Sequence, residues 1–509
     1  MGKQENIYKK LHKWPGLIIS FLLLNFSLSG IFMNHREVFS GLDVNREILP
    51  RDYTLQNWNN ASLKGNLIIN NDSILVYGNI GIWLTNSTFH NYQSFNKGFP
   101  KGIDNRKIFA INKTSNGELY AATLFGLYAF NKTFKEWQKF KNLEGSDRFT
   151  SIESVGDTIY ALTRSNLFKG KARGINTVFT KNELSAPAGY IKEVSLFQTI
   201  WQIHSGEIFG LPGKLFVDLL GLITAFLSLT GIIYFFFPGW IKRRFQRNRT
   251  STHIVRANRW SLKWHNKLGR WTYLALIILF ATGMFLRPPL LIPIAKINNA
   301  SIKFTHLDNS NPWFDKLRDI IFDDERGIFL LSTSEGMFWM DLKNLNPAKF
   351  DNQPPVSVMG INVFQHDTDG AFLIGSFSGL FLWNPDKPDI INYTNGALFE
   401  GNYGGRPIGD FKITGLLHDI SGNKYMIDYE KGVLPLWNDK LFPKMPANIL
   451  SSSKMSLWNL CLEIHTGRFF HFLLNDFYIL IVPLTGLLSI MVVFSGYFLW
   501  RKRYKNYNN

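Results

Sequence analysis

Histidines stand at matched positions in four apolar segments of this chain. His12 opens one apolar run, and His265 opens another 253 positions later. His204 and His465 open two further runs, and 261 positions separate these two residues. An imidazole binds a metal ion through a ring nitrogen, and ionisable residues at membrane depth are functional candidates. Histidines that are repeated in register therefore predict a cofactor site.

Glycines accompany the first two histidines. Gly30 follows His12 by 18 residues, and Gly283 follows His265 by 18 residues. Residues with this spacing lie on one face of an α-helix, and a glycine there lets a neighbouring helix or a flat macrocycle approach the backbone. Imidazole is a suitable axial ligand of haem iron, and helices in a bundle can offer two imidazoles from opposite sides. The spacing thus favours haem as the cofactor.

The elements that must position these residues are membrane helices. Four apolar stretches are long enough to cross a hydrocarbon layer of about 30 Å. The first follows a basic N-terminus, but no small-residue cleavage site follows it, so we interpret it as a retained anchor. The predicted spans are Leu17–Met33, Leu215–Phe237, Trp271–Leu286 and Phe477–Trp500.

The net charge of +18 is concentrated beside these spans. Ten Lys or Arg and no acid lie between Lys242 and Arg270, and most of the remaining excess lies in the N-terminal 16 residues and after Trp500. Positive residues favour the cytoplasmic side. This rule places both termini and the middle segment in the cytoplasm and the two long segments outside. Membrane topology explains the charge, so we expect a lipid bilayer and no nucleic acid as partner.

Topology also sorts the four matched histidines into two levels. His12 and His265 fall at the cytoplasmic edge, where they predict an inner haem. His204 and His465 fall at the outer edge, each just before an inward-running span, and they predict an outer haem. Two haems at two levels would let an electron cross the membrane.

Two further histidines near the outer face break the repeat. The position that matches His35 is Pro288, and the position that matches His471 is Gly210. Either histidine is an alternative ligand of the outer haem or a partner for a haem propionate. A second alternative stays open, in which edge histidines lie only at the level of the lipid headgroups.

The long outer segments contain repeated short strands. Asn-Gly or Asp-Gly turns are followed by a strand and then by a Gly-aliphatic-aromatic element, at spacings of roughly 40 to 50 residues, which is typical of propeller blades. The pattern resembles the periplasmic propeller repeats of bacterial hybrid two-component sensors. About three blades per lobe predict one six-bladed propeller built from both lobes, with two separate β-lobes as the alternative. The elements include Gly81-Ile82-Trp83, Gly126-Leu127-Tyr128, Gly336-Met337-Phe338, Gly379-Leu380-Phe381 and Gly432-Val433-Leu434.

The predicted fold class is a four-helix membrane bundle with an internal duplication, joined to an all-β periplasmic portion. Cys461 is the one cysteine, so no disulfide within the chain holds the lobes. The expected segments are an N-terminus with the first span (1–35), β lobe 1 (36–195), the second span (196–240), a basic cytoplasmic loop (241–270), the third span (271–287), β lobe 2 (288–455), the fourth span (456–500) and a cytoplasmic tail (501–509).

The membrane portion resembles a known family. Leu11–Gly16 with Ser29-Gly30, Ile203–Gly213 with Thr230-Gly231, and Ile464–Phe470 are similar to motifs of the PepSY-associated transmembrane helix family. That family includes iron-regulated membrane proteins and ferric-siderophore reductases of the bacterial inner membrane. Its members often carry PepSY domains outside the membrane, whereas this chain carries propeller-like strands.

The resemblance implies b-type haem, two per chain, and an oxidoreductase that passes electrons to a ferric siderophore or similar iron chelate in the periplasm. No Rossmann or flavin fingerprint is present, so the electron donor is expected to be quinol or a separate reductase. Two other classes remain open. One is a sensor or adaptor whose propeller binds a ligand or a partner protein, and the other is a transport accessory without redox activity.

Overall fold

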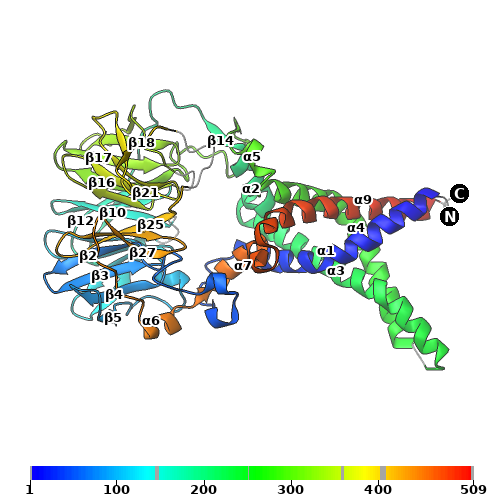
Figure 1. The fold of residues 1–509 in the computed structure, drawn as a ribbon. Helices are drawn as coiled ribbons and strands as arrows, with labels where there is room; N and C mark the ends of the chain where they lie inside the picture. Colours follow the sequence, from blue (N-terminus) through cyan, green and yellow to red (C-terminus); the bar gives the residue numbers. More distant parts are fainter. Residues whose placement is uncertain (1–2, 144–147, 250–251, 357–359, 402–408, 506–509) are drawn as a thin grey trace. The chain divides into compact units, whose positions relative to one another are not determined.

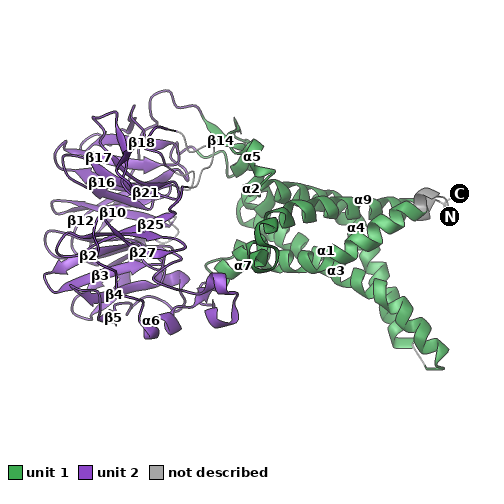
Figure 2. Ribbon diagram, viewed as in Figure 1, with its two compact units in different colours: residues 1–39, 192–309, 457–509 green, residues 40–191, 310–456 purple. Residues whose placement is uncertain are grey.

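The computed structural model describes residues 3–143, 148–249, 252–356, 360–401 and 409–505. The chain forms two compact units (Figure 2). Unit 1 consists of Met1–Phe39, Lys192–Asn309 and Leu457–Asn509, and unit 2 consists of Ser40–Ile191 and Ser310–Ser456. Each unit therefore combines segments that are far apart in the sequence.

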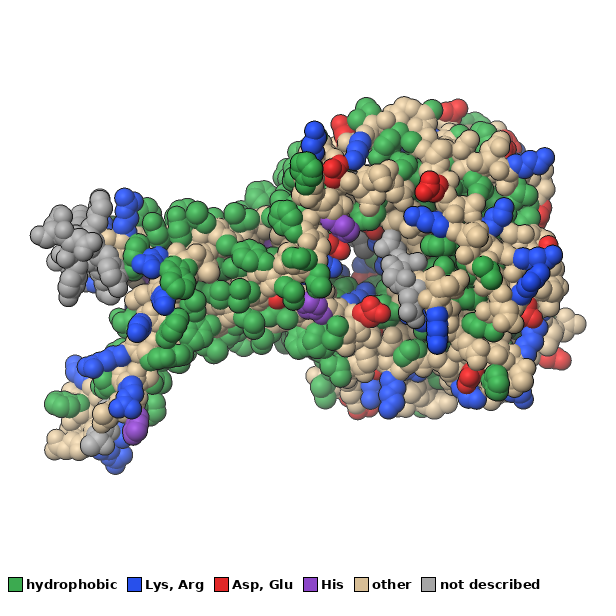
Figure 3. Space-filling model, turned by 180° about the vertical axis from the view of Figure 1, so that it is seen from behind, with side chains coloured by type: hydrophobic (Ala, Val, Ile, Leu, Met, Phe, Trp, Pro, Cys, Tyr) green, Lys and Arg blue, Asp and Glu red, His purple; other side chains and the backbone are tan. Residues whose placement is uncertain are grey.

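Unit 1 contains four helices long and apolar enough to cross a membrane, and they confirm the four predicted spans. Their outward side chains are mainly hydrophobic (Figure 3), as expected for a surface in contact with lipid. The apolar windows have mean hydropathies of 2.0, 2.1, 1.5 and 2.4 along the chain. The helices are α1 (Lys3–Asn34), α3 (Gly210–Gln246), α4 (Thr252–Phe285) and α9 (Ile481–Lys505).

The four long helices pack in a ring. Helix α1 contacts α3 and α9, and α4 contacts the same two helices. Helix α1 begins at the end of the bundle where α9 finishes (Figure 1), and we call this the terminal end. Small residues allow close approach between helices, since a Cβ on Gly486 would lie 2.7 Å from Met284 Cβ.

Two short helices stand before the second and fourth long helices, at the far end of the bundle. Helix α2 (Leu196–Ser205) contacts α4, and α7 (Leu457–His465) contacts α1. Gly206 and Gly467 follow them with φ of +79° and +78°, a conformation that glycine adopts without steric cost. A Cβ on Gly206 would also lie 2.2 Å from the Gly213 carbonyl oxygen. These turns place the ends of the short helices beside the bundle.

The structure corrects three predicted boundaries. The predicted loop 241–270 is largely helical in its described residues, because α3 continues to Gln246 and α4 starts at Thr252. Lys and Arg favour helix, and the basic residues lie on an arm that both helices form (Figure 3). Residues 288–309 belong to unit 1, where α5 (Leu291–Ile294) lies and β14 (Glu193–Ser195) pairs with β15 (Asn298–Ala300). Residues 501–505 of the predicted tail continue α9, and residues 506–509 lie outside the described residues.

Unit 2 contains six antiparallel sheets among its described residues, and a short pair, β1 (Asp43–Val44) with β28 (Met455–Ser456), and α6 (Ala447–Ser452) accompany them. The first three sheets are β2 (Gly65–Asn70), β3 (Ser73–Gly78), β4 (Gly81–Asn86) and β5 (Tyr92–Ser94); β6 (Ile108–Lys113), β7 (Leu119–Thr123), β8 (Gly126–Asn131) and β9 (Glu136–Lys139); β10 (Phe149–Val155), β11 (Thr158–Thr163), β12 (Leu167–Lys171) and β13 (Phe179–Asn182). The others are β16 (Leu317–Asp323), β17 (Ile328–Thr333), β18 (Gly336–Asp341) and β19 (Ala348–Lys349); β20 (Val363–His366), β21 (Phe372–Ser376), β22 (Gly379–Trp383), β23 (Ile390–Asn392) and β24 (Ala397–Leu398); β25 (Ile413–His418), β26 (Lys424–Asp428) and β27 (Gly432–Leu436).

The six sheets contact one another in cyclic order. The first strands β2, β6, β10, β16, β20 and β25 each contact the next, and β25 contacts β2 again. Both predicted lobes lie in this one unit, three sheets from each. The contacts thus agree with the interpretation as a single ring of six blades and disagree with two separate lobes. In five blades the repeated glycine begins the third strand, as in β4, β8, β18, β22 and β27.

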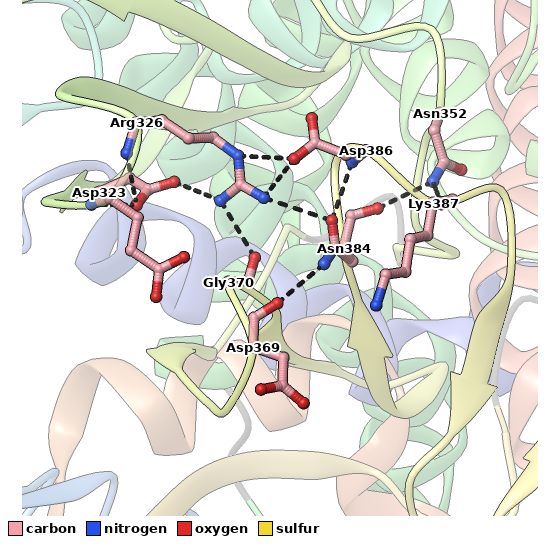
Figure 4. A network of polar contacts seen from close by, with 9 residues as sticks. Asp323, Arg326, Asn352, Asp369, Gly370, Asn384, Asp386 and Lys387 are labelled. Carbon is pink, nitrogen blue, oxygen red and sulfur yellow. Dashed lines mark hydrogen bonds and ion pairs between the residues drawn. The ribbon is translucent and has the colours of Figure 1, made fainter.

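Polar contacts join neighbouring blades. Asn66 donates to the His418 carbonyl at 2.8 Å and accepts from the His418 amide at 2.9 Å, which links the first blade to the last. The Arg326 guanidinium, from the turn after β16, binds Asp323 at 2.6 Å and the Gly370 carbonyl at 3.1 Å (Figure 4). It thereby connects the fourth and fifth blades. The Asn66–His418 hydrogen bonds therefore join the two lobes of the sequence, whereas the Arg326 contacts join two sheets within the second lobe.

Candidate functional site: two histidine pairs

The structure brings the four matched histidines together in two pairs within unit 1. His12 of α1 faces His265 of α4, with ring centroids 6.0 Å apart and ring planes at 85°. His204 of α2 faces His465 of α7, with centroids again 6.0 Å apart and planes at 53°. We call these the terminal pair and the far pair, after the ends of the bundle where they lie. Each pair contains the two histidines that the sequence offsets predict to be partners.

Backbone carbonyls fix the orientation of these rings. Nδ1 of His12 lies 2.8 Å from the Val492 carbonyl oxygen. In the far pair, Nδ1 of His204 lies 3.0 Å from the Leu279 carbonyl oxygen. A carbonyl oxygen only accepts hydrogen bonds, so Nδ1 must be the protonated nitrogen. The neutral ring then keeps a lone pair on Nε2, which is the form of histidine that binds metals.

The same arrangement recurs at the other two rings. Nδ1 of His465 lies 2.9 Å from the Phe26 carbonyl oxygen, and His265 bonds the Leu227 carbonyl. Each histidine is thus tied to a helix that is not its own. All four imidazoles are pre-organised with Nε2 available.

A Ser or Thr followed by Gly stands beside each histidine. The hydroxyl of Thr230 lies 2.9 Å from Nδ1 of His265, and that of Ser29 lies 3.1 Å from Nδ1 of His465. In every case the carbonyl that holds Nδ1 belongs to the residue three positions before this Ser or Thr. One local motif is therefore used four times: Ser29-Gly30, Thr230-Gly231, Thr282-Gly283 and Ser495-Gly496.

The glycine of each motif makes room for the imidazole. A Cβ on Gly283 would lie 2.7 Å from His204 Cε1, and one on Gly496 would lie 2.8 Å from His12 Cε1. At Gly30 the corresponding distance to His465 is 3.1 Å. Optimal separations between carbon atoms are about 3.5 to 4.0 Å, so a side chain at these positions would displace the ring.

A cavity of about 1150 Å³ surrounds the terminal pair. Both imidazoles line it together with glycines and aliphatic side chains of all four long helices. Lys9, Lys13 and Arg270 also line it. Pockets for organic ligands are typically about 300 to 1,000 Å³, so this one has the volume for a large ligand, and its three cationic residues are suited to negatively charged groups.

The pairs differ from an ordinary protein metal centre. Among the described residues, no group of three or more His, Cys, Asp or Glu is placed to hold a metal ion. Two imidazoles supply only two ligands, whereas structural metal sites of proteins usually use four. A metal between either pair would thus need further ligands that another molecule provides.

His35 and His471 occupy different surroundings. Nε2 of His35 lies within hydrogen-bond distance of Asp218 of α3, at 2.6 Å, and Asn34 donates to the same carboxylate at 2.9 Å. The Asp218 carboxylate thus engages Nε2 of His35, and the alternative in which His35 replaces a matched histidine stays a prediction. His471 lies in α8 (His471–Leu474) and packs edge-to-face on Tyr478, with centroids 5.5 Å apart.

Sequence reasoning missed several polar partners. The Ser/Thr-Gly motif was visible in register, but its hydrogen bonds to Nδ1 were not foreseen. Asp218 is buried, and its only signal was an acid within an apolar helix.

Comparisons with known proteins complete the description. No curated protein matches the chain. Solved structures that share some likeness include the extracellular domain of a hybrid two-component system from B. thetaiotaomicron, at 12% identity over 79% of this chain and 40% of that one, with a TM-score of 0.33. A protein of unknown function from Bacteroides thetaiotaomicron has 9% identity over 77% and 74% of the two chains and a TM-score of 0.35. PorZ of the type-IX secretion system of Porphyromonas gingivalis has 10% identity over 77% and 39%, with a TM-score of 0.31. Scores this low support no conclusion on function.

The family comparison is decisive. The sequence profile of the PepSY-associated TM region matches residues 2–238 and again residues 236–503, so each match contains one long helix pair and its histidines. The duplication seen in the offsets is thus a duplication of a family unit. The chain belongs to the family of PepSY-associated transmembrane proteins.

Proposed function

We propose that each histidine pair holds one b-type haem and that the protein passes electrons across the bacterial inner membrane to a ferric chelate in the periplasm. The observation that carries the proposal is the matched geometry of the pairs, with ring centroids 6.0 Å apart in both. Two imidazoles that bound one metal ion at about 2.0 Å, with about 1.1 Å from each nitrogen to its ring centre, would have centroids about 6.2 Å apart. The protein holds its imidazoles within a few tenths of an ångström of that value.

The donor set also supports haem. A porphyrin would supply the four further nitrogen ligands that a two-imidazole site lacks. The cavity at the terminal pair supplies the space, and its Lys9, Lys13 and Arg270 are suited to propionate groups. When bound, haem supplies one-electron chemistry. The protein orients Nε2 through the Nδ1 hydrogen bonds and keeps the site in an apolar bundle.

The spacing of the two pairs suits transfer across a membrane. Along α1, 18 residues separate His12 of the terminal pair from Gly30, which packs on His465 of the far pair. This corresponds to about 27 Å of helix, close to the thickness of the hydrocarbon layer. The two sites would therefore lie near opposite membrane surfaces.

The distribution of Lys and Arg sets the proposed direction of electron transfer. The N-terminus, the arm of α3 and α4 and the end of α9 carry most of the excess Lys and Arg. The positive-inside rule assigns the terminal end to the cytoplasm and unit 2 to the periplasm. Quinol or a separate reductase would then supply electrons, and a ferric siderophore or similar chelate would receive them. Reduction weakens the hold of hard oxygen ligands on iron.

Reoxidation kinetics test this function. The purified protein is reduced under anaerobic conditions and mixed with ferric citrate or a ferric hydroxamate, and the haem bands are followed. We expect rapid reoxidation by the ferric chelate and none by the matched gallium(III) chelate, which has the same charge and shape but does not accept an electron. Reduced haem that is stable towards every ferric chelate would refute the reductase function and favour a sensor or transport accessory.

A further inference from the structure

Two arginines flank the far histidine pair. Arg287 follows α4 four residues after Gly283, the glycine that packs on His204. Arg468 follows His465 by three residues and starts a short 3-10 helix after the Gly467 turn. Each arginine thus stands within four residues of His465 or of the glycine that packs on His204.

These guanidinium groups lack part of their expected hydrogen bonding. The Nε atoms of Arg287 and Arg468 are buried and have no hydrogen-bond partner within the described ranges. One Nη of Arg468 binds Glu463 of α7 at 2.6 Å. A buried guanidinium N–H without an acceptor is costly, so native proteins usually provide an acceptor or bind one.

The charges around Arg287 also favour a bound anion. Burial and the neighbouring Arg468 lower the pKa of Arg287, while Tyr478 and Glu463 act in the opposite direction. Arg468 pairs with Glu463, and the same carboxylate contributes to the pKa of Arg287. Like charges held together at a membrane edge are stabilised when an anion binds between them.

We propose that Arg287 and Arg468 form a carboxylate-binding site beside the far histidine pair. A guanidinium presents a planar fork of donors that matches a carboxylate with two parallel hydrogen bonds. The carboxylate comes either from the side chain of a cofactor held by His204 and His465, which rests on the proposed function, or from a free carboxylate ligand that approaches this end of the bundle. The cations that line the cavity at the terminal pair would be the counterpart in the other half.

The first arm of the test measures the cofactor in the purified full-length protein. The variants are Arg287→Gln and Arg468→Gln, and the matched control is Arg259→Gln, which removes an exposed arginine from the arm of α4. If cofactor carboxylates occupy the site, each variant should bind one of its two haems about ten- to hundred-fold more weakly. This is the expected effect of losing one charge-assisted hydrogen bond. The midpoint potential of that haem should also fall, because a positive charge nearby favours the reduced form. Arg287→Lys should restore the potential more than the binding.

The second arm uses citrate as a free tricarboxylate probe and measures thermal stability. If free carboxylates occupy the site, citrate stabilises the wild-type protein and the control but not the two variants, and haem content stays the same. Variants that match Arg259→Gln in haem retention, potential and citrate response would overturn the inference. The spectrum of the terminal haem reports folding in each variant. A wild-type protein without haem would refute the proposed function alone, since the citrate arm still decides the arginine site.

Discussion

The glycine beside each imidazole gives a graded prediction. A Cβ added at Gly283 would lie 2.7 Å from His204 Cε1, whereas one added at Gly231 would lie 3.7 Å from His265 Cε1. With a carbon contact optimum of about 3.5 Å, Gly283→Ala must move the His204 ring by about 0.8 Å, and Gly231→Ala requires no movement. Metal–ligand distances tolerate about 0.2 Å. Gly283→Ala should therefore detach His204 from a bound metal, and Gly231→Ala should not detach His265.

Carbon monoxide binding to the reduced protein measures this difference. Haem with two firmly held imidazoles has no open coordination position, so the wild-type protein and Gly231→Ala should leave the spectrum unchanged when carbon monoxide is added. Gly283→Ala should bind it at about half of the haems. Alanine is a better helix former than glycine, so the helices themselves are not weakened. Equal behaviour of the two alanine variants would refute the packing argument.

Three further predictions concern the terminal pair and unit 2. Thr230→Val removes the hydroxyl 2.9 Å from His265 Nδ1 and should weaken haem binding about tenfold or more. Transfer of haem to an acceptor protein measures this change. Unchanged haem binding would count against a role for this hydrogen bond. Asn66→Ala removes both hydrogen bonds to His418 between the first and last sheets of unit 2. It should lower the free energy of unfolding of unit 2 by about 1 to 3 kcal/mol, which thermal unfolding measures. An unchanged unfolding transition would contradict closure of the ring at this contact. Burial raises the pKa of Asp319 to about 7 from 3.8, so the folded state binds this proton more tightly and should lose stability as pH rises from about 4 to 7. Asp319→Asn should reduce that pH dependence of the melting temperature, and an identical pH profile would argue against a buried carboxyl.

The sequence predicted the pairing of the histidines because duplication keeps equivalent residues at equivalent depth. The offsets alone placed His12 with His265 and His204 with His465. Helix periodicity and hydropathy likewise located the four spans. Both inferences depend on local patterns that survive divergence of the surrounding residues.

The partners of these histidines depend on how the helices rotate about one another. His12 bonds the Val492 carbonyl, 480 positions away, and no local pattern identifies that contact. The side-chain contact of His35 with Asp218 joins residues 183 positions apart. The two arginines beside the far pair follow different helices, so no local pattern predicts that they flank the same histidine pair.

The basic segment 241–270 shows a different limit of prediction from sequence. Its charge suggested a cytoplasmic loop, but Lys and Arg are good helix formers and the apolar helices extend through them on both sides. Hydropathy marks where a helix leaves the membrane and does not mark where the helix ends. The long α3 and α4 therefore could not be delimited from composition.

The most direct test of the account is the haem content of the protein and of two single-histidine variants. We expect two b-type haems per wild-type chain, measured as the pyridine haemochrome against protein concentration. His12→Ala should lose the haem of the terminal pair and His204→Ala that of the far pair, so each keeps one haem, and the two remaining spectra should differ. A folded wild-type protein without haem, or variants that both keep two haems, would contradict the assignment.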